Sequence, residues 1–292
     1  MTTPRFPAPF PYQRIRFVAQ VEHPIELPPF AGSALRGVFG HSLRKLACAT
    51  GAPTCDGCPL RHQCAYERIF EPSPPDRARR QYRQIPAAFV LTPPDTQGRL
   101  ATGAQLEFGV TLIGSAIKQR DLLIAAWQRA LLAGLGPTRG TARLTKCHED
   151  APLLQPDEHA TQLTLQFQTP LFLKRQGKQL NPNEITASEI TTALVRRIAD
   201  LAELQLGWPL DWDFPALTQA ARSIDTRNST LSWASNSRWS NRQQQHMELR
   251  GAVGHITLSG KLQPFIELLT LGQALHIGGK TSFGLGRYCI TQ

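Results

Sequence analysis

The chain has 292 residues, of which 41% are hydrophobic and 18% charged, enough for two domains that each bury a core. Its 32 Lys and Arg against 22 Asp and Glu give a formal net charge of +10, so nucleic acid is the first partner to consider. No apolar run is long enough to cross a bilayer and no secretory signal opens the chain, so we expect a cytoplasmic protein without a membrane partner.

The N-terminal part of the chain predicts a strand followed by a helix. Residues 14–22 alternate apolar and polar side chains, the pattern of a half-buried strand. Residues 33–47 predict a helix, with Ser33 as its N-cap. Its apolar side chains recur at helical spacing and are expected to face the core: Leu35, Val38, Phe39, Leu43 and Leu46. Three polar side chains are then expected on the opposite face: His41, Arg44 and Lys45.

A cysteine-rich segment, residues 48–72, interrupts this pattern. It contains Cys48, Cys55, Cys58 and Cys64, and the step from Cys55 to Cys58 has the CxxC spacing of zinc sites. Four thiolates in so short a stretch predict a structural zinc ion that holds the loop together, without an open position for catalysis. Free thiols or an iron–sulfur cluster are the alternatives. Nothing in the segment indicates a small-molecule cofactor.

The rest of the first half completes a recurring order of elements. Residues 72–83 are proline-rich and basic and are expected to form a loop, either plainly solvated or in contact with nucleic acid. The following residues predict two strands, a helix and a strand, over 87–91, 105–113, 119–133 and 143–147. The order strand, helix, strand, strand, helix, strand is the ferredoxin-like plan of RNA-recognition domains. We therefore expect an α+β domain over residues 1–150.

A proline-rich acidic stretch, residues 150–157, marks a boundary after which the same order is expected again. The second half predicts strands and helices over 163–174, 185–206, 229–239, 247–258, 262–271 and 287–291. Residues 208–214 are expected to form an aromatic insertion. The two halves show no clear sequence identity, so the expected second ferredoxin-like domain, residues 151–292, rests on this pattern alone.

A glycine-rich loop, residues 276–287, is expected before the last strand. Its glycines permit close approach of a phosphate backbone, and its Lys and Arg add positive charge. A nucleotide-binding P-loop requires glycine where Ala274 stands, and a dinucleotide fingerprint requires glycine where Cys289 stands. An ordinary turn is the alternative. The candidate RNA-binding residues are Gly278, Gly279, Lys280, Thr281, Ser282, Gly284, Gly286 and Arg287.

Several motifs together resemble a known family. They are PFAGSALRG (29–37), YERIFE (66–71), RWSNRQQ (238–244), GAVGHI (251–256) and HIGGKTSFGLGRY (276–288). With the cysteine segment, they resemble the CRISPR-associated endoribonucleases of the RAMP superfamily, which cut precursor CRISPR RNA. The resemblance covers nearly the whole chain.

The resemblance implies two tandem ferredoxin-like domains and a glycine loop that contacts repeat RNA. It implies metal-independent cleavage, in which a general base removes the 2′-OH proton and a general acid protonates the leaving 5′-oxygen. The products would be a 2′,3′-cyclic phosphate and a 5′-OH. The implied partners are CRISPR repeat RNA, as precursor and as mature crRNA, and other CRISPR effector subunits.

The resemblance also implies roles for individual residues. The family often places a catalytic histidine on or after its first helix, where His41 stands, and Lys45 and Arg36 could stabilise the charge on the phosphate. Tyr66 and His23 are reserve candidates. Arg238 and Arg242 are expected to contact RNA, and His255 and His276 to be structural or to contact RNA.

Two other functions remain open at this point. One is a RAMP subunit that holds crRNA without cutting it. The other is a zinc-stapled adaptor that binds proteins, for which the net charge would be incidental.

Overall fold

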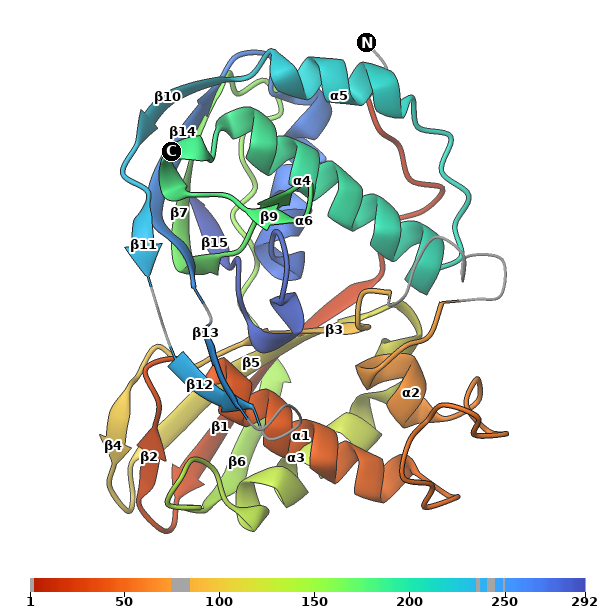
Figure 1. The fold of residues 1–292 in the computed structure, drawn as a ribbon, viewed down its shortest axis with the longest axis vertical. Coiled ribbons are helices and arrows are strands. Elements are labelled where there is room, and N and C mark those ends of the chain that lie inside the picture. The colour runs from red at the N-terminus through yellow and green to blue at the C-terminus, as the bar shows by residue number, and fades with distance from the viewer. Residues whose placement is uncertain (1–2, 75–84, 235–236, 241–244, 249, 292) are drawn as a thin grey trace. The chain divides into compact units, whose positions relative to one another are not determined.

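The computed structural model describes residues 3–74, 85–234, 237–240, 245–248 and 250–291 (Figure 1). The chain divides into two compact units, each of which is described by itself. The N-terminal unit holds Pro11–Asp150 and Leu204–Gly207. The C-terminal unit holds Met1–Phe10, Ala151–Glu203 and Trp208–Gln292.

A four-stranded antiparallel sheet forms the N-terminal unit together with three α-helices. Its strands are β1 (Tyr12–Val21), β3 (Phe89–Thr92), β5 (Gln105–Ile113) and β6 (Ala142–Glu149). They pair in the order β3-β5-β1-β6, with β1 in a central position. The helices are α1 (Gly32–Ala47), α2 (Ala65–Phe70) and α3 (Arg120–Ala133), the last preceded by a 3-10 turn at Gly114–Gln119. A small ribbon pairs β2 (Ile25–Leu27) with β4 (Gly98–Leu100).

Aromatic side chains fill the space between this sheet and its helices. Trp127 on α3 stacks on Phe39 of α1 with ring centroids 4.6 Å apart, and it contacts Phe108 of β5 at the same centroid distance. Phe17 of β1 stacks on Phe108 at 5.1 Å. Burial of such large apolar surfaces fixes α1 and α3 on one face of the sheet, which determines the side of α1 that remains exposed.

The C-terminal unit contains a second antiparallel sheet, of five strands. Its main strands are β7 (Gln162–Leu171), β10 (Asp225–Ser229), β14 (Gly251–Ser259) and β15 (Tyr288–Thr291), in the order β10-β14-β7-β15. β11 (Ser232–Ala234) also pairs with β14. The helices are α4 (Ala187–Asp200), α5 (Phe214–Arg222) and α6 (Ile266–Leu275), and a π-helical turn, Leu201–Gln205, follows α4. Two hairpins pair β8 (Lys174–Arg175) with β9 (Lys178–Gln179), and β12 (Ser237–Ser240) with β13 (Gln245–Glu248).

The mixed helix and strand composition with antiparallel sheets confirms the predicted class at that level. Two details of the first helix were predicted wrongly. α1 begins at Gly32, and the N-cap position is Ala31, which has no capping side chain, so Ser33 lies inside the first turn. Leu46 is 42% exposed because the apolar stripe ends with Leu43, one turn before the helix terminates.

The first ten residues lie in the C-terminal unit, although we expected them in the domain 1–150. The reason is an aromatic cluster. Phe6 lies 5.4 Å from Trp212 and Phe10 lies 6.0 Å from Trp208, measured between ring centroids, and the Trp212 indole donates to the Arg5 carbonyl at 2.9 Å. The predicted aromatic insertion at 208–214 therefore anchors the N-terminus of the chain.

Two expectations from the sequence can be placed only in part. The basic stretch predicted as a loop over 72–83 falls mostly on residues 75–84, which lie outside the described residues. Within the described part of the chain, no helix has the length and apolar character needed to span a membrane.

Candidate functional site

The exposed face of α1 presents a stripe of three residues at intervals of one helical turn. Gly37, His41 and Lys45 are all exposed, and they lie at positions i, i+4 and i+8 of the helix. The opposite face carries Leu35, Phe39 and Leu43, which are fully buried. The predicted outward orientation of His41 and Lys45 is therefore confirmed.

Gly37 leaves the surface beside His41 open. A Cβ atom placed on Gly37 would meet no other atom within 4 Å. Because Gly37 lies one turn before His41 and has no side chain, a polymer backbone can approach the helix there without a steric barrier. The exposed imidazole of His41 therefore has no side chain beside it at Gly37, one turn before, and the ammonium group of Lys45 one turn after.

The two arginines of α1 do not lie on this stripe. Arg36 is stacked on Phe70 of α2, with its guanidinium carbon 4.1 Å from the ring centroid. Arg44 turns toward the cysteine segment, where its Nη2 donates to the carbonyls of Ala52 and, at 2.8 Å, Pro53. Arg44 was expected on the polar face with His41 and Lys45, but its guanidinium is engaged with the loop backbone.

Tyr66 does not have the surroundings of a proton-transfer group. It lies on α2 with only 6% of its surface exposed and stacks on Phe70 with centroids 5.3 Å apart. Desolvation, followed by the negative charge of Glu71, raises the pKa of Tyr66 to about 12. His23, the other reserve candidate, is exposed, with Nδ1 2.8 Å from the Thr141 hydroxyl. Of these three candidates, His41 and His23 are exposed and Tyr66 is buried.

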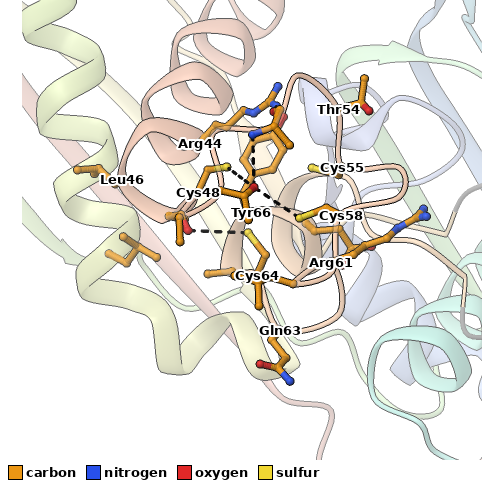
Figure 2. Close-up of a pocket in the computed structure, with 18 residues that line it drawn as sticks. Arg44, Leu46, Cys48, Thr54, Cys55, Cys58, Arg61, Gln63, Cys64 and Tyr66 are labelled. Carbon is orange, nitrogen blue, oxygen red and sulfur yellow. Dashed lines mark hydrogen bonds and ion pairs between the residues drawn. The ribbon is translucent and has the colours of Figure 1, made fainter.

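The four cysteines of the segment line one pocket at the end of α1 (Figure 2). The pocket has a volume of about 380 Å³ and also contains Arg44, Tyr66 and the apolar side chains of Leu46 and Leu60. The Thr50 hydroxyl lies between two of the sulfurs, 3.8 Å from Cys48 Sγ and 3.6 Å from Cys58 Sγ. The hydrogen bond between the Thr50 hydroxyl and Cys48 is the largest cause of a lowered pKa at Cys48. Desolvation raises the pKa of Cys55.

This arrangement of thiols is not itself a metal site. Across the described residues, no three His, Cys, Asp or Glu side chains are placed to hold a metal ion together. Two arginines hold the segment instead, Arg44 through the loop carbonyls and Arg61 through side chains. Arg61 contacts Asp56 at 2.9 Å, the Ser73 hydroxyl at 2.6 Å and the buried Glu67 at 3.5 Å. The chemistry of the donors suits zinc but their placement does not, so the zinc site stays a prediction.

The glycine loop connects α6 to β15 and turns tightly against the end of β7. Three of its glycine amides donate to carbonyls of the same unit: Gly279 to Phe172 at 2.9 Å, Gly284 to Thr281 at 2.8 Å, and Gly286 to Pro170 at 2.9 Å. These amides are occupied by protein acceptors and do not present themselves to an anion. The glycines serve close packing, since a Cβ on Gly286 would lie 1.9 Å from the Ile277 carbonyl oxygen.

The side chains of the loop differ in their access to solvent. Lys280, Ser282 and Arg287 are half-buried, while the Thr281 side chain is buried. The Lys280 ammonium lies 4.5 Å from the centroid of the Phe172 ring. The positive charges expected here are thus placed at the surface of the C-terminal unit, on a loop whose backbone is fixed by hydrogen bonds.

The remaining predicted contacts are located less fully. Arg238 lies on β12, where only the backbone pairing is described, and Arg242 lies outside the described residues. His276 is 1% exposed with Nδ1 3.2 Å from the Leu285 carbonyl, which makes it a structural residue. His255 is half-buried, with Nδ1 3.0 Å from the Thr230 hydroxyl.

Arg197 is a positioning residue that the sequence did not reveal. From α4 its Nε donates to the carbonyls of Leu275 at 2.9 Å and His276 at 3.0 Å, where α6 ends and the glycine loop begins. Desolvation lowers the pKa of Arg197 to about 10, a value at which the guanidinium remains charged at neutral pH. An arginine in an amphipathic helix has no sequence signal that separates it from a solvated one.

Two family models match the chain in succession. Residues 10–168, more than half of the chain, match the model AF_1859_N, described as an N-terminal domain. Residues 165–288 match the model of the CRISPR-associated endoribonuclease Cas6. A protein of Archaeoglobus fulgidus described as uncharacterized is 30% identical over 130 residues, which make up 44% of this chain and 44% of the relative. The match therefore spans less than half the length of that relative.

Several solved structures have a similar fold. A Cas6 product complex is 17% identical with a TM-score of 0.60, covering 96% of this chain and 100% of that chain. A RAMP protein binding different RNA substrates is 12% identical with a TM-score of 0.54, covering 96% and 100%. A partial Cas6-RT-Cas1–Cas2 complex is 13% identical with a TM-score of 0.59, covering 98% of this chain and 47% of that chain. At these identities the likeness establishes the fold.

Proposed function

We propose that this chain, whose residues 165–288 match the Cas6 family model, is a CRISPR-associated endoribonuclease of the RAMP superfamily that processes precursor crRNA, and that it cuts repeat RNA without a metal ion. We propose that each compact unit is a ferredoxin-like domain, with the cysteine-rich segment 48–72 inserted in the first. The strand orders β3-β5-β1-β6 and β10-β14-β7-β15 support this, because both place the first and third main strands centrally, with a helix after each.

The observation that carries the proposed activity is the exposure of His41 on α1. An imidazole titrates near neutral pH, so it can act as general base toward the 2′-OH or general acid toward the leaving 5′-oxygen. The alkoxide attacks the adjacent phosphorus while the bond to the 5′-oxygen breaks, and the proton taken from the 2′-OH is balanced by one given to that oxygen. The products are a 2′,3′-cyclic phosphate and a 5′-OH.

Lys45 supplies the second function that this reaction needs. The pentacoordinate phosphorus carries additional negative charge, and an ammonium group close to it lowers the barrier. Lys45 lies one turn after His41 on the same exposed stripe, and Gly37 leaves room for the RNA backbone on the other side. Arg36, stacked on Phe70, would have to leave that ring to contribute, and Tyr66 contributes packing.

A substrate with a single 2′-deoxy nucleotide at the cut site tests this reaction directly. We expect the protein to bind this RNA with unchanged affinity and to leave it intact, because the nucleophile is missing. Cleavage of the deoxy substrate at the same position would show that water, not the 2′-OH, attacks the phosphorus. Gel analysis of the labelled RNA over time makes the comparison.

Repeat RNA is the proposed substrate, and the glycine loop is its proposed contact on the C-terminal unit. Among the similar structures, one is a Cas6 product complex, one is a RAMP protein binding RNA substrates, and one is a complex with Cas1 and Cas2. We propose that the protein acts in the cytoplasm and that other CRISPR effector subunits are among its partners. Lys280 and Arg287 would contact the RNA backbone, with Arg238 and Arg242 as further contacts.

Neutralising two charges of the glycine loop should reveal these contacts. For the double variant Lys280→Gln and Arg287→Gln we expect weaker RNA binding and a smaller dependence of affinity on salt. Each phosphate contact on single-stranded RNA contributes about 0.7 to the slope of log K against log salt, so the slope should fall by roughly 1.4. Affinity and slope equal to those of the parent protein would remove the loop from the binding site.

We also propose that the cysteine pocket takes up one zinc ion as a structural group. The four thiols line one pocket, but they would have to converge, and the Thr50 hydroxyl would have to leave its place between Cys48 and Cys58. Elemental analysis should find about one zinc per chain, and the pair Cys55→Ser and Cys58→Ser should lose it. Cys147→Ser, a change on β6, is the matched control. Well under one metal ion per parent chain would reject the zinc site.

A further inference from the structure

A short basic hairpin follows β7 in the C-terminal unit. In it β8 pairs with β9, and the five residues from Lys174 to Lys178 are all exposed. The two residues of its turn, Gln176 and Gly177, have φ angles of 51° and 80°. Two successive residues with positive φ form the turn type that fits the twist of a hairpin. The backbone that carries Lys174 and Lys178 is therefore held in a defined conformation.

The hairpin carries three positive side chains, one of which forms ion pairs. Arg175 forms ion pairs with Glu189 at 3.0 Å and Glu184 at 3.6 Å, which tie the hairpin to the beginning of α4. Among the described residues, neither Lys174 nor Lys178 has an ion-pair partner. The two acidic side chains beside the hairpin are thus engaged by Arg175, and the lysines present positive charge to solvent.

The base of the hairpin joins it to the glycine loop. The Phe172 carbonyl accepts the Gly279 amide at 2.9 Å. Two ammonium groups lie near the Phe172 ring, with Lys174 Nζ 5.4 Å and Lys280 Nζ 4.5 Å from its centroid. Cation–π attraction holds both lysines over one half-buried ring. The hairpin and the loop therefore form one continuous positive surface within the unit.

A second pair of cation and aromatic ring extends this surface. The Gln179 side chain on β9 donates to the Arg250 carbonyl at 2.8 Å. Arg250 is exposed, and its guanidinium carbon lies over the Trp233 ring, 3.7 Å from the ring centroid. A guanidinium stacked on an aromatic ring is a platform on which an unpaired base can stack, whereas paired bases in a stem are already stacked.

We propose that this hairpin surface, made of Phe172, Lys174, Lys178, Trp233, Arg250 and Lys280, binds an unpaired segment of the RNA beside the stem. Lys174 and Lys178 contact its phosphates, and Arg250 on Trp233 stacks against a base. The proposal rests on the proposed function, because it names the part of the same RNA that a second region of the unit recognises. Lysines at defined positions beside aromatic groups fit single-stranded nucleic acid.

The test compares two RNAs on the full-length protein. One is the repeat stem-loop alone, and the other is the same stem-loop with an unpaired extension on each side. We expect the parent protein to bind the extended RNA more tightly, and the double variant Lys174→Gln and Lys178→Gln to bind both RNAs with nearly the affinity that the parent has for the stem-loop alone. The salt slope for the extended RNA should fall by about 1.4, from two lost phosphate contacts.

Lys261→Gln is the matched control, because Lys261 is an exposed lysine on a loop of the same unit. It should leave both affinities unchanged. The proposal is overturned if the double variant binds the extended RNA like the parent, or if it loses the same factor on both RNAs. If the parent binds neither RNA, the proposed function itself fails. If the parent binds the extended RNA more tightly and the double variant binds it equally well, only the hairpin proposal fails.

Discussion

Replacing His41 by alanine should lower the single-turnover rate of RNA cleavage by ~10²-fold or more, the usual contribution of a proton-transfer group. RNA affinity should stay close to that of the parent protein. The change removes an exposed imidazole that makes no contribution to the core, since Leu35, Phe39 and Leu43 on the other face of α1 are retained. Rates measured with excess protein over labelled repeat RNA separate the chemical step from binding.

His148→Ala is the control for this experiment, because His148 is an exposed histidine on β6 of the same unit. It should cleave at the parental rate. If His41→Ala also cleaves at that rate, the catalytic assignment is wrong, and His23 is the next residue to test. Tyr66 is the weaker alternative, because its burial and its pKa of about 12 oppose proton transfer near neutral pH.

Gly286→Ala should destabilise the C-terminal unit and weaken RNA binding together. Gly286 has a φ of 72°, and a non-glycine residue in a sparsely populated region costs about 1–3 kcal/mol. The new Cβ would also lie 1.9 Å from the Ile277 carbonyl oxygen, so the backbone at the start of the loop must move. We expect the free energy of unfolding to fall by more than ~2 kcal/mol, measured by denaturant titration.

Gly177→Ala separates the two contributions. Gly177 has a φ of 80° in the same unit, but a Cβ there would meet nothing within 4 Å. It should therefore show the cost of the backbone angle alone, about 1–2 kcal/mol. Equal losses in the two alanine variants would mean that the contact with Ile277 is relieved at no cost, and that the loop is less rigid than its hydrogen bonds indicate.

The order of elements could be predicted from the sequence because buried faces leave a periodic pattern. β1, β5 and β7 alternate strongly, and α1 and α4 carry clear apolar stripes. The short helix α2 was missed because six residues give less than two turns of pattern. The hairpin of β8 and β9 was missed because its strands have two residues each and no apolar residue, so they leave no alternating pattern.

The candidate site could be predicted only where local sequence determines orientation. The spacing of Leu35, Phe39 and Leu43 determined the exposure of His41 and Lys45. The direction of Arg44 could not be predicted, because it depends on the carbonyls of Ala52 and Pro53 in a folded loop. The glycine loop shows the same limit. Its composition suggested amides open to phosphate, whereas the fold gives those of Gly279, Gly284 and Gly286 to carbonyls.

The cysteine segment illustrates a different limit. Sequence spacing predicted that its four thiols share one neighbourhood, and they do line one pocket. Spacing could not show that Arg61 links Asp56, Ser73 and the buried Glu67 across the same segment. These contacts connect the part of the segment before α2 with α2 itself and with the residue Ser73 after it. They give the loop a framework that does not depend on the thiols.

The measurement that tests the central claim most directly is incubation of the purified protein with labelled RNA from its own repeat array, in excess EDTA, with analysis of the product ends. We predict cleavage at one position, a 2′,3′-cyclic phosphate on the upstream fragment and a 5′-OH on the downstream fragment. Tight binding without any product would contradict the account and indicate a subunit that only holds crRNA. Products that form only after a divalent metal is restored, with a 5′-phosphate, would contradict it as well.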